Sequence, residues 1–192
     1  MPTKKILRKQ YLQKREDLTE QQYQEKNRQI FDRFFDAFSF THATVVHCFL
    51  PSTRQREVNT YSIIQQLQTI RAVRIAVPRC APSQTLTHHW LTSDTILVNN
   101  RWGIPEPVNS PLVSPTLIDL VLVPLLAFDQ RGYRVGYGQG FYDRFLAQCR
   151  PDTQKVGLSL EPPVTRVDDT DIYDVALDGC IMPDGVWRKL EQ

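Results

Sequence analysis

The beginning of the chain carries the hydrophobic spacing of two consecutive helices. Within residues 4–18 and again within residues 20–38, apolar side chains recur four or seven positions apart, which places them on one helical face. Thr19 separates the two stripes, and Gln22 follows it at the spacing of a capping box, a signal for the start of a helix. The apolar positions are Ile6, Leu7, Tyr11 and Leu18 in the first stripe and Tyr23, Ile30, Phe34 and Phe38 in the second.

After residue 40 the pattern changes to short apolar runs that are typical of strands. ATVVHCFL (43–50) has the length and the β-branched residues of a buried strand, YSIIQQLQTI (61–70) returns to helical spacing, and RIAVP (74–78) predicts a second buried strand. QTLTHHWL and ILVNN predict further strands. The proline-punctuated WGIPEPVNSPLVSP (102–115) is predicted to be a loop, because proline cannot donate to a strand or continue a helix.

The most apolar run of the chain, LIDLVLVPLLAF (117–128), predicts a central strand that ends at Pro124. A long glycine-containing connection follows, then a predicted helix, FYDRFLAQC (141–149), and a predicted strand, KVGLSL (155–160). The acidic tail beyond residue 160 is expected to be an extended loop with one last strand. This alternation of strands and helices predicts an α/β fold with a mostly parallel central sheet.

The composition limits the classes of protein that this chain can represent. With 192 residues, 41% of them hydrophobic and 23% charged, we expect one globular domain over residues 1–192. The net charge of +2 and the absence of an apolar span or secretory signal predict neither nucleic acid nor membrane as a partner. The four cysteines have no zinc-finger or C-x-x-C spacing, which fits a reducing cytoplasm. His88 and His89 are neighbours in a predicted strand, so they should face opposite sides rather than share a metal. We expect a monomer.

The segment VGYGQGFYDRFL (135–146) holds the strongest candidate for a binding loop. Gly136, Gly138 and Gly140 follow the predicted central strand and precede a predicted helix, at the strand end where open α/β sheets bind ligands. The spacing is neither the dinucleotide fingerprint nor the P-loop. Arg134 and Asp143 flank the glycines and could contact phosphate oxygens and magnesium. The spacing alone leaves a phosphate loop and a plain turn equally open.

The longer segment VPLLAFDQRGYRVGYGQGFYDRFL (123–146) resembles the signature of the 5-formyltetrahydrofolate cyclo-ligase family. KKILRKQYLQKR, FLPSTRQREVNT and RWGIPEP resemble further segments of that family in the same order. The resemblance implies a three-layer NagB/RpiA/CoA-transferase-like fold. It also implies the ATP- and Mg²⁺-dependent conversion of 5-formyltetrahydrofolate to 5,10-methenyltetrahydrofolate with release of ADP and phosphate. In that reaction the formyl oxygen is phosphorylated and N10 of the folate closes the ring.

The resemblance also implies a set of site residues. The catalytic positions are Arg134 and Tyr142. The ATP-binding positions are Lys4, Lys5, Arg8, Arg134, Gly136, Tyr137, Gly138, Gln139, Gly140, Phe141 and Tyr142. The folate-binding positions are Ser52, Glu57, Trp102 and Tyr142. The Mg²⁺ positions are Asp143 and Asp168, with Asp169, Asp171 and Asp174 competing for the second match.

The chain departs from the family pattern at Phe141 and in the divergent segment VTRVDDTDIYDVALD (164–178), where the same four aspartates compete for the second carboxylate. Many family members carry tyrosine at the position of Phe141, so a role for that hydroxyl is lost here. Two other functions stay open. The first alternative function is a catalytically inactive, folate-binding or regulatory protein of the same fold. The second is an ATP-dependent ligase for a related formyl or thiamine-like substrate. The intact set of Lys4, Arg8, Arg134 and Asp143 favours an ATP-using enzyme over pure folate binding.

Overall fold

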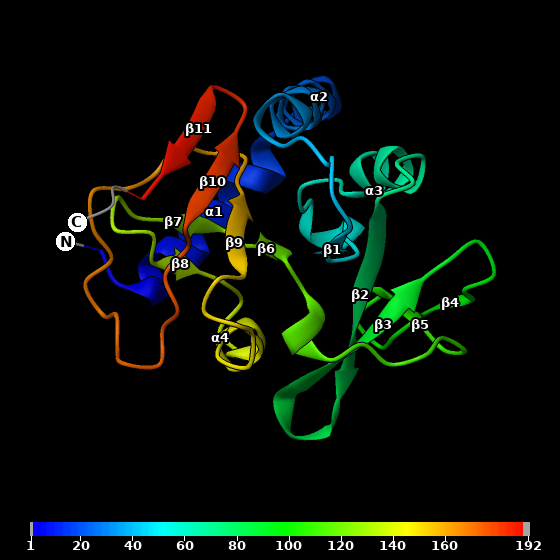
Figure 1. Ribbon diagram of the computed structural model, residues 1–192. Helices are drawn as coiled ribbons and strands as arrows, with labels where there is room; N and C mark the ends of the chain where they lie inside the picture. Colours follow the sequence, from blue (N-terminus) through cyan, green and yellow to red (C-terminus); the bar gives the residue numbers. More distant parts are fainter. Residues whose placement is uncertain (1, 190–192) are drawn as a thin grey trace.

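The computed structural model, which describes residues 2–189, is organised around a seven-stranded sheet with the strand order β11-β10-β9-β6-β1-β2-β3 (Figure 1). The five inner strands run parallel, whereas β3 and β11 pair antiparallel at the two edges. The strands of this sheet are β1 (Thr44–His47), β2 (Val73–Ala81), β3 (Thr85–Leu91), β6 (Leu120–Pro124), β9 (Gln154–Leu158), β10 (Gly179–Met182) and β11 (Gly185–Arg188).

The centre of the sheet is the strand that the longest apolar run predicts. Leu120 and Leu122 of β6 join the hydrophobic core on one face of the sheet, and Val121 and Val123 join the core on the other face. A parallel strand with helices on both sides is buried on both faces, so its sequence is continuously apolar rather than alternating. β6 ends at Pro124, as predicted.

Helices cover both faces of the sheet and make three layers (Figure 1). On one face lie α2 (Glu20–Ala37) and α3 (Tyr61–Gln68), and on the other lies α4 (Phe141–Leu146). The buried Phe34 of α2 packs into the first core and the buried Phe145 of α4 into the second. The predicted three-layer α/β fold with a mostly parallel sheet is therefore confirmed.

The first helix, α1 (Lys4–Asp17), packs against a small hairpin rather than against the large sheet. Its buried residues are Leu7, Tyr11 and Arg15, spaced four apart on one face. Ile6, which the sequence pattern placed in the apolar stripe, is 49% exposed. The break between α1 and α2 follows the prediction, because Thr19 and Gln22 form the capping box at the start of α2.

Three short strands that the sequence pattern did not predict lie beside two turns. The connection after β6 folds into a hairpin of β7 (Ala127–Phe128) and β8 (Arg134–Val135), in which the carboxylate of Asp129 accepts from the backbone N–H groups of Arg131 and Tyr133. The tail ends in two strands, β10 and β11, because Pro183 and Asp184 form a two-residue turn between them. These strands form because turn residues fold the chain back on itself, and hydrophobic periodicity does not reveal such turns.

The proline-punctuated segment also contains a strand. β5 (Pro105–Pro107) pairs with β4 (Leu97–Asn99) in a separate two-stranded ribbon. The prolines are tolerated because a ribbon of two short strands leaves one edge of each strand without a partner. Three short 3₁₀ helices complete the described elements, namely Thr53–Gln55, Pro82–Gln84 and Pro115–Leu117. Within residues 2–189, no helix combines the length and apolar character needed to span a bilayer.

Candidate active site

A large cavity opens at the carboxyl ends of the inner strands. The chain leads from β1 to β2 on one side of the sheet and from β6 to β9 on the other, so the topology reverses between β1 and β6. Such a switch point is where open α/β sheets bind ligands. The cavity has a volume of about 1400 Å³ and is lined by Phe49 and Ser52 after β1, Pro78 in β2 and Pro124 at the end of β6. Pockets for one drug-sized molecule measure about 300–1000 Å³, so this cavity has room for two ligands.

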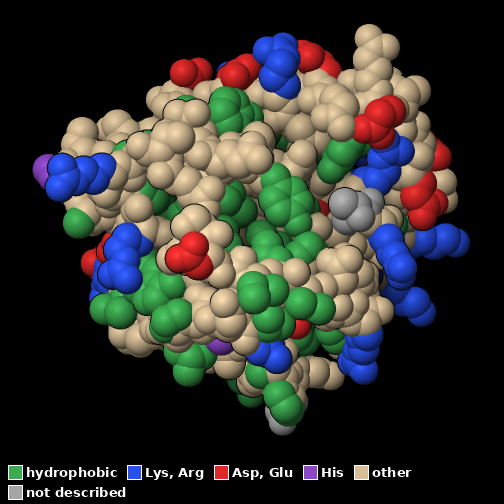
Figure 2. Space-filling model, turned by 90° about the vertical axis from the view of Figure 1, so that its right-hand side faces the viewer, with side chains coloured by type: hydrophobic (Ala, Val, Ile, Leu, Met, Phe, Trp, Pro, Cys, Tyr) green, Lys and Arg blue, Asp and Glu red, His purple; other side chains and the backbone are tan. Residues whose placement is uncertain are grey.

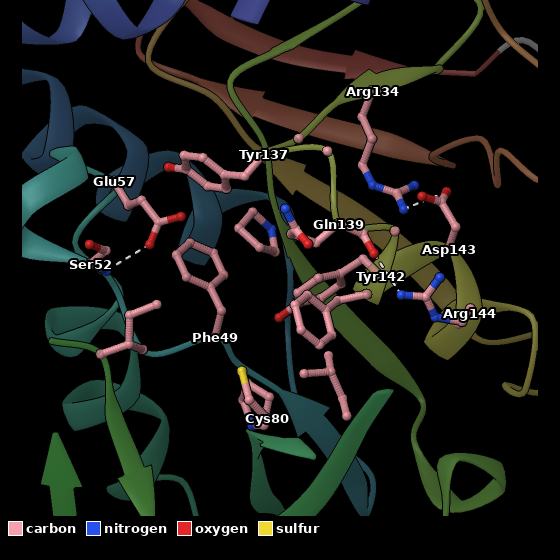
Figure 3. A pocket seen from close by; sticks show the side chains of 18 of the residues that line it. Phe49, Ser52, Glu57, Cys80, Arg134, Tyr137, Gln139, Tyr142, Asp143 and Arg144 are labelled. Carbon is pink, nitrogen blue, oxygen red and sulfur yellow. Dashed lines mark hydrogen bonds and ion pairs between the residues drawn. The ribbon is translucent and has the colours of Figure 1, made fainter. Parts of the chain in front are cut away.

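Two walls face each other across this cavity. The glycine wall consists of Lys4, Arg8, Arg134, Gly136, Tyr137, Gly138, Gln139, Gly140, Phe141, Tyr142, Asp143, Arg144 and the segment 171–175. The strand-end wall consists of Phe49, Leu50, Ser52, Arg54, Gln55, Glu57, Pro78, Cys80, Leu86, Arg101, Trp102, Ile104 and Glu106. Figure 3 shows side chains of both walls directed toward the space between them. On the face of the molecule in Figure 2, the surface is hollowed near its centre and hydrophobic side chains are visible inside the hollow.

The glycine loop has a backbone shape that its residue type explains. Gly138 and Gly140 have φ values of +88° and +65°, which side-chain-bearing residues rarely adopt. Arg8 of α1 lies over this loop, because its Nε donates to the backbone oxygen of Gly136 at 2.8 Å and its Nη2 lies 3.1 Å from the position of a Cβ on Gly138. Gly136 has no neighbouring atom within 4 Å of such a Cβ. Gly136 also lines the cavity, and the space beside it is open.

Two partly buried ion pairs organise the charges of the glycine wall. Arg134 is 8% exposed and donates from Nη2 to Asp143 Oδ1 at 2.7 Å and from Nη1 to the backbone oxygen of Val175 at 2.7 Å. Burial lowers the pKa of Arg134, and the neighbouring Asp143 and Asp174 act in the opposite direction. Lys4 of α1 pairs with Asp174, with its Nζ 2.5 Å and 2.7 Å from the two carboxylate oxygens. α1 and the C-terminal loop thus meet at the glycine wall.

The strand-end wall carries one deeply buried carboxylate. Glu57 is 6% exposed, and its Oε2 accepts from the backbone N–H of Ser52 at 2.6 Å (Figure 3). Burial raises the pKa of Glu57, whereas the Ser52 amide, the charge of Arg15 and the side chain of Tyr137 lower it. A carboxylate in such a place is suited to accept hydrogen bonds from a polar ligand edge.

Tyr142, one of the two predicted catalytic residues, has its hydroxyl group in the protein interior. The residue lines the cavity, but its hydroxyl is buried and has no hydrogen-bond partner among the described residues. Burial also raises the pKa of this hydroxyl. The accessible part of Tyr142 therefore lies away from Oη, which fits a packing contact to a ligand better than proton transfer in this conformation.

Aromatic and polar residues form the rim of the strand-end wall. Trp102 lines the cavity, is 42% exposed and carries the guanidinium of Arg101 at 4.1 Å from its ring centre. Glu106 accepts from the backbone N–H of Cys80 at 3.0 Å and from the side-chain amide of Asn100 at 2.7 Å. Burial raises the pKa of the Cys80 thiol to about 12, so this cysteine is protonated at neutral pH.

The structure brings most of the predicted site residues into one cavity. Of the proposed ATP-binding positions, Lys5 is exposed and is not among the lining residues. Of the competing aspartates, Asp171 and Asp174 line the cavity, whereas Asp168 and Asp169 do not. The other predicted site residues line it.

Two arginines, one in the cavity wall and one behind it, were not predicted from the sequence. Arg144 bridges the glycine loop and the 3₁₀ helix after β2, because it donates to the backbone oxygens of Gln139 and Gln84 at 2.6 Å each. Arg15 lies buried behind the two walls. A signal for Arg15 existed, since it continues the four-residue spacing of Leu7 and Tyr11 on the buried face of α1. Nothing in the pattern distinguished Arg144 from a solvated charge.

Comparison with known proteins identifies the family of the chain. The sequence matches the 5-formyltetrahydrofolate cyclo-ligase family over residues 1–176. The chain belongs to this family. It is 31% identical over 184 residues to the 5-formyltetrahydrofolate cyclo-ligase of Escherichia coli K12, which covers 92% of this chain and 98% of the relative. It is 27% identical over 158 residues to the probable 5-formyltetrahydrofolate cyclo-ligase of Schizosaccharomyces pombe, which covers 74% and 77% of the two chains.

Solved structures agree with this assignment to the cyclo-ligase family. The 5,10-methenyltetrahydrofolate synthetase of Aquifex aeolicus superposes with a TM-score of 0.83 at 26% identity and covers 98% of this chain and 94% of its own. The 5,10-methenyltetrahydrofolate synthetase of Mycoplasma pneumoniae gives a TM-score of 0.74 at 22% identity, with 94% and 98% covered, and shows the same fold. The cyclo-ligase described here is thus a ligase enzyme of folate one-carbon metabolism.

Proposed function

We propose that this cyclo-ligase converts 5-formyltetrahydrofolate to 5,10-methenyltetrahydrofolate in an ATP- and Mg²⁺-dependent reaction that releases ADP and phosphate. The observation that carries the proposal is the single cavity of about 1400 Å³ with two unlike walls. One wall joins a glycine loop to Lys4, Arg8 and Arg134, which suits a polyphosphate. The other wall joins the buried Glu57 to aromatic side chains, which suits a flat heterocycle with hydrogen-bond donors at its edge.

The proposed chemistry requires alignment and charge neutralisation rather than a protein nucleophile. The γ-phosphoryl group of ATP passes to the formyl oxygen, and N10 attacks the activated formyl carbon and gives up its proton. The C–O bond to phosphate then breaks as the ring closes, and inorganic phosphate leaves. Phosphoryl transfer of this kind depends on positioning and electrostatic stabilisation. Lys4, Arg8 and Arg134 would neutralise phosphate oxygens, and the open space beside Gly136 would let a phosphate approach the backbone.

Two carboxylates fit a magnesium ion beside the phosphates. Both contacts of Asp143 to Arg134 and to the backbone N–H of Val175 use Oδ1, which leaves Oδ2 for a metal. Mg²⁺ keeps several waters and uses one or two protein carboxylates together with substrate phosphates, so it needs no dense cluster. Within residues 2–189 no group of three or more His, Cys, Asp or Glu side chains is arranged to hold a metal by itself.

The identity of the second magnesium ligand is part of the proposal. Asp171 and Asp174 line the cavity, whereas the predicted Asp168 does not. Both carboxylate oxygens of Asp174 hold Lys4 Nζ, which a bound metal would displace. We therefore propose Asp143 with Asp174 ahead of Asp143 with Asp168. Bound Mg²⁺ would withdraw charge from the phosphate oxygens during transfer.

The folate would occupy the strand-end wall. Glu57 would accept hydrogen bonds from donor groups of the pterin, held in place by the Ser52 amide. The accessible surface of Tyr142 and the rim residue Trp102 would pack against the ring system. Lys5 is exposed and outside the lining residues, so we give it no direct contact with ATP.

A substitution in the glycine loop tests whether this loop holds phosphate or only turns the chain. A methyl group on Gly136 would meet no protein atom within 4 Å, so Gly136→Ala should fold normally. If a phosphate occupies that space, the variant should bind ATP at least about 10-fold more weakly by calorimetry. Gly185→Ala is the matched control, because it has equally open surroundings but lies outside the cavity. Unchanged ATP affinity in Gly136→Ala would favour the plain turn.

Turnover tests the proposed reaction directly. Purified protein with 5-formyltetrahydrofolate, ATP and Mg²⁺ should form the methenyl product, followed by its near-ultraviolet absorbance, and EDTA should stop the reaction until Mg²⁺ is restored in excess. Folate binding without Mg²⁺-dependent nucleotide binding would instead favour the inactive, folate-sequestering alternative. A substrate panel with other formyl compounds and thiamine-like compounds tests the alternative ligase.

We further propose that the enzyme acts in the cytoplasm as a monomer. The four free cysteines support the cytoplasmic location. A reducing compartment keeps thiols in this state. Sedimentation with and without ligands tests the monomer.

A further inference from the structure

A buried arginine that does not line the cavity lies behind the junction of its two walls. Arg15 is 5% exposed, and its guanidinium donates to three different segments. Nη1 donates to the hydroxyl of Tyr137 at 2.9 Å and to the backbone oxygen of Gln55 at 3.3 Å, and Nη2 donates to the backbone oxygen of Leu125. Tyr137 belongs to the glycine wall, Gln55 to the strand-end wall, and Leu125 to the turn after β6.

The phenol of Tyr137 extends this connection to the buried carboxylate. Figure 3 shows the Tyr137 side chain reaching from the glycine loop toward Glu57. The positive charge of Arg15 and the side chain of Tyr137 both lower the pKa of Glu57, against the larger effect of burial. Burial and the charge of Glu57 in turn raise the pKa of the Tyr137 hydroxyl, which keeps it protonated as a donor.

Packing alone does not account for an arginine in this position. A guanidinium loses much hydration free energy on burial, and an apolar residue would fill the same face of α1 at lower cost. Within the described residues, the contacts of Arg15 are carbonyl oxygens and one phenol, with no carboxylate in direct ion pair. Its charge therefore acts across Tyr137 on Glu57 rather than being cancelled locally.

We propose that Arg15 is a positioning residue that couples the nucleotide half of the cavity to the folate half, by holding the Tyr137 phenol beside Glu57. When the glycine loop becomes ordered around a nucleotide, Tyr137 is fixed beside Glu57. The strand-end wall then binds the folate more tightly. By thermodynamic reciprocity, folate improves nucleotide binding by the same factor. The inference rests on the proposed function, since it requires both ligands in one cavity.

Calorimetry measures the coupling. The wild-type protein is titrated with 5-formyltetrahydrofolate, first alone and then with saturating Mg²⁺ and a non-hydrolysable ATP analogue. The analogue should tighten folate binding by a factor within the roughly 5- to 150-fold range of typical couplings. In Arg15→Gln and in Tyr137→Phe this factor should fall close to one. Arg33→Gln is the matched control, because Arg33 is a half-buried arginine on α2 that also donates to a backbone oxygen, that of Pro183, outside the cavity.

A pH profile separates this role from a merely structural one. The groups facing Glu57 are Arg15 from α1, Tyr137 and Tyr142 from the glycine wall, and Tyr23 of α2, which donates to the Glu57 backbone oxygen at 2.6 Å. Folate affinity should decrease as the pH falls and Glu57 takes up a proton. Loss of the Arg15 charge removes an influence that favours the carboxylate, so in Arg15→Gln the midpoint of this decrease should move to higher pH. Arg15→Lys keeps the charge and should restore the midpoint but not the full coupling.

The outcomes separate this inference from the proposed function. If both ligands bind to the wild-type protein without affecting each other, or if Arg15→Gln and Tyr137→Phe keep the wild-type coupling and pH midpoint, the inference is overturned alone. If no nucleotide binds, the proposed function and the coupling are both overturned. If Arg15→Gln does not fold, as circular dichroism would show, Tyr137→Phe decides, because it removes one hydroxyl and leaves the arginine in place.

Discussion

The two walls of the cavity hold their charges in different ways. On the glycine wall two cations are paired with carboxylates, since Arg134 contacts Asp143 and Lys4 contacts Asp174, whereas Arg8 and Arg144 donate to backbone oxygens. On the strand-end wall the buried Glu57 has a backbone amide as its direct partner and receives positive potential from a distance. The first wall has preformed ion pairs that a charged ligand and its metal would rearrange. On the second wall the buried Glu57 carboxylate is held by an amide rather than by a cation.

This difference predicts different consequences of mutation. Removal of one member of a buried ion pair leaves the other charge without compensation, which costs more than the pair itself contributes. Replacement of Glu57 by glutamine removes the charge but keeps the shape of the side chain and one acceptor oxygen. It should therefore weaken ligand binding more than it destabilises the fold. The following experiments test the comparison in order of decreasing expected effect.

The largest effect is expected at the ion pair of the glycine wall. Arg134→Ala removes a buried cation that faces the proposed phosphates and leaves Asp143 unpaired, so kcat/KM should fall by about 10³-fold or more. Asp143→Ala should be similarly inactive. The exposed pair of Arg28 with Glu25 on α2 supplies the control Arg28→Ala, which should keep full activity. Full activity in both Arg134→Ala and Asp143→Ala would refute the proposed role of this wall.

Glu57→Gln should separate the two ligands. The amide can keep one acceptor but loses the negative charge, so we expect folate affinity to fall by roughly 10- to 100-fold. Nucleotide affinity measured without folate should stay within a factor of about two of the wild-type value. Calorimetry with each ligand alone measures both quantities, and Glu25→Gln on the exposed face of α2 is the control. Equal losses for the two ligands would show that the walls are not separate sites.

Gly138→Ala tests the backbone of the glycine wall. Gly138 has a φ of +88°, and a Cβ there would come within 3.1 Å of the Arg8 guanidinium. We expect a loss of unfolding free energy of about 1–2 kcal/mol and weaker ATP binding, whereas Gly136→Ala should weaken ATP binding without the loss of stability. Urea denaturation and calorimetry on both variants measure these two quantities. Equal stability of the two variants would contradict the strained conformation at Gly138.

A buried histidine pair packs against α4, the helix that follows the glycine loop, and should make the stability of the protein sensitive to acid. His88 Nδ1 lies 3.1 Å from His47 Nε2, and the His88 ring stacks on Phe145 of α4 at 3.9 Å between ring centres. Burial lowers the pKa of His88 to about 4. Between about pH 6.5 and 4 the unfolded chain therefore binds a proton that the folded protein does not, so stability falls as the pH falls through this window.

The variant His88→Gln should lose this part of the pH dependence. Glutamine is neutral and can still hydrogen-bond to His47, so its stability difference between pH 7.5 and 5 should be smaller than that of the wild type by on the order of 1–2 kcal/mol. Urea denaturation at the two pH values measures the difference. His42→Gln, at an exposed position, should behave like the wild type. A pH dependence unchanged in His88→Gln would show that His88 does not titrate as described.

Hydrophobic periodicity was sufficient to predict the main elements of the fold. The uninterrupted run of β6, the helical stripe of α2 and the capping box at Thr19 report interactions that lie within a few residues of each other or depend only on burial. Short strands such as β7, β8 and β11 were missed, because two to four residues are too few to show a period. Their formation depends on turn residues such as Asp129 and on strand partners.

The candidate site, like the fold, could be predicted from the sequence only in its local parts. The sequence by itself determined the glycine loop, its flanking Arg134 and Asp143, and the family to which these residues point, because they lie close together in one motif. The tertiary structure decided what distant segments contribute. It placed Asp174 rather than Asp168 in the cavity, left Lys5 outside it, turned the Tyr142 hydroxyl into the interior, and buried Arg15 behind Tyr137. The physical reason is that the burial and pairing of a charge depend on segments that are far apart in the sequence. Arg15 and the backbone oxygen that accepts from it at Leu125, for example, are 110 residues apart, and no local pattern encodes such a contact.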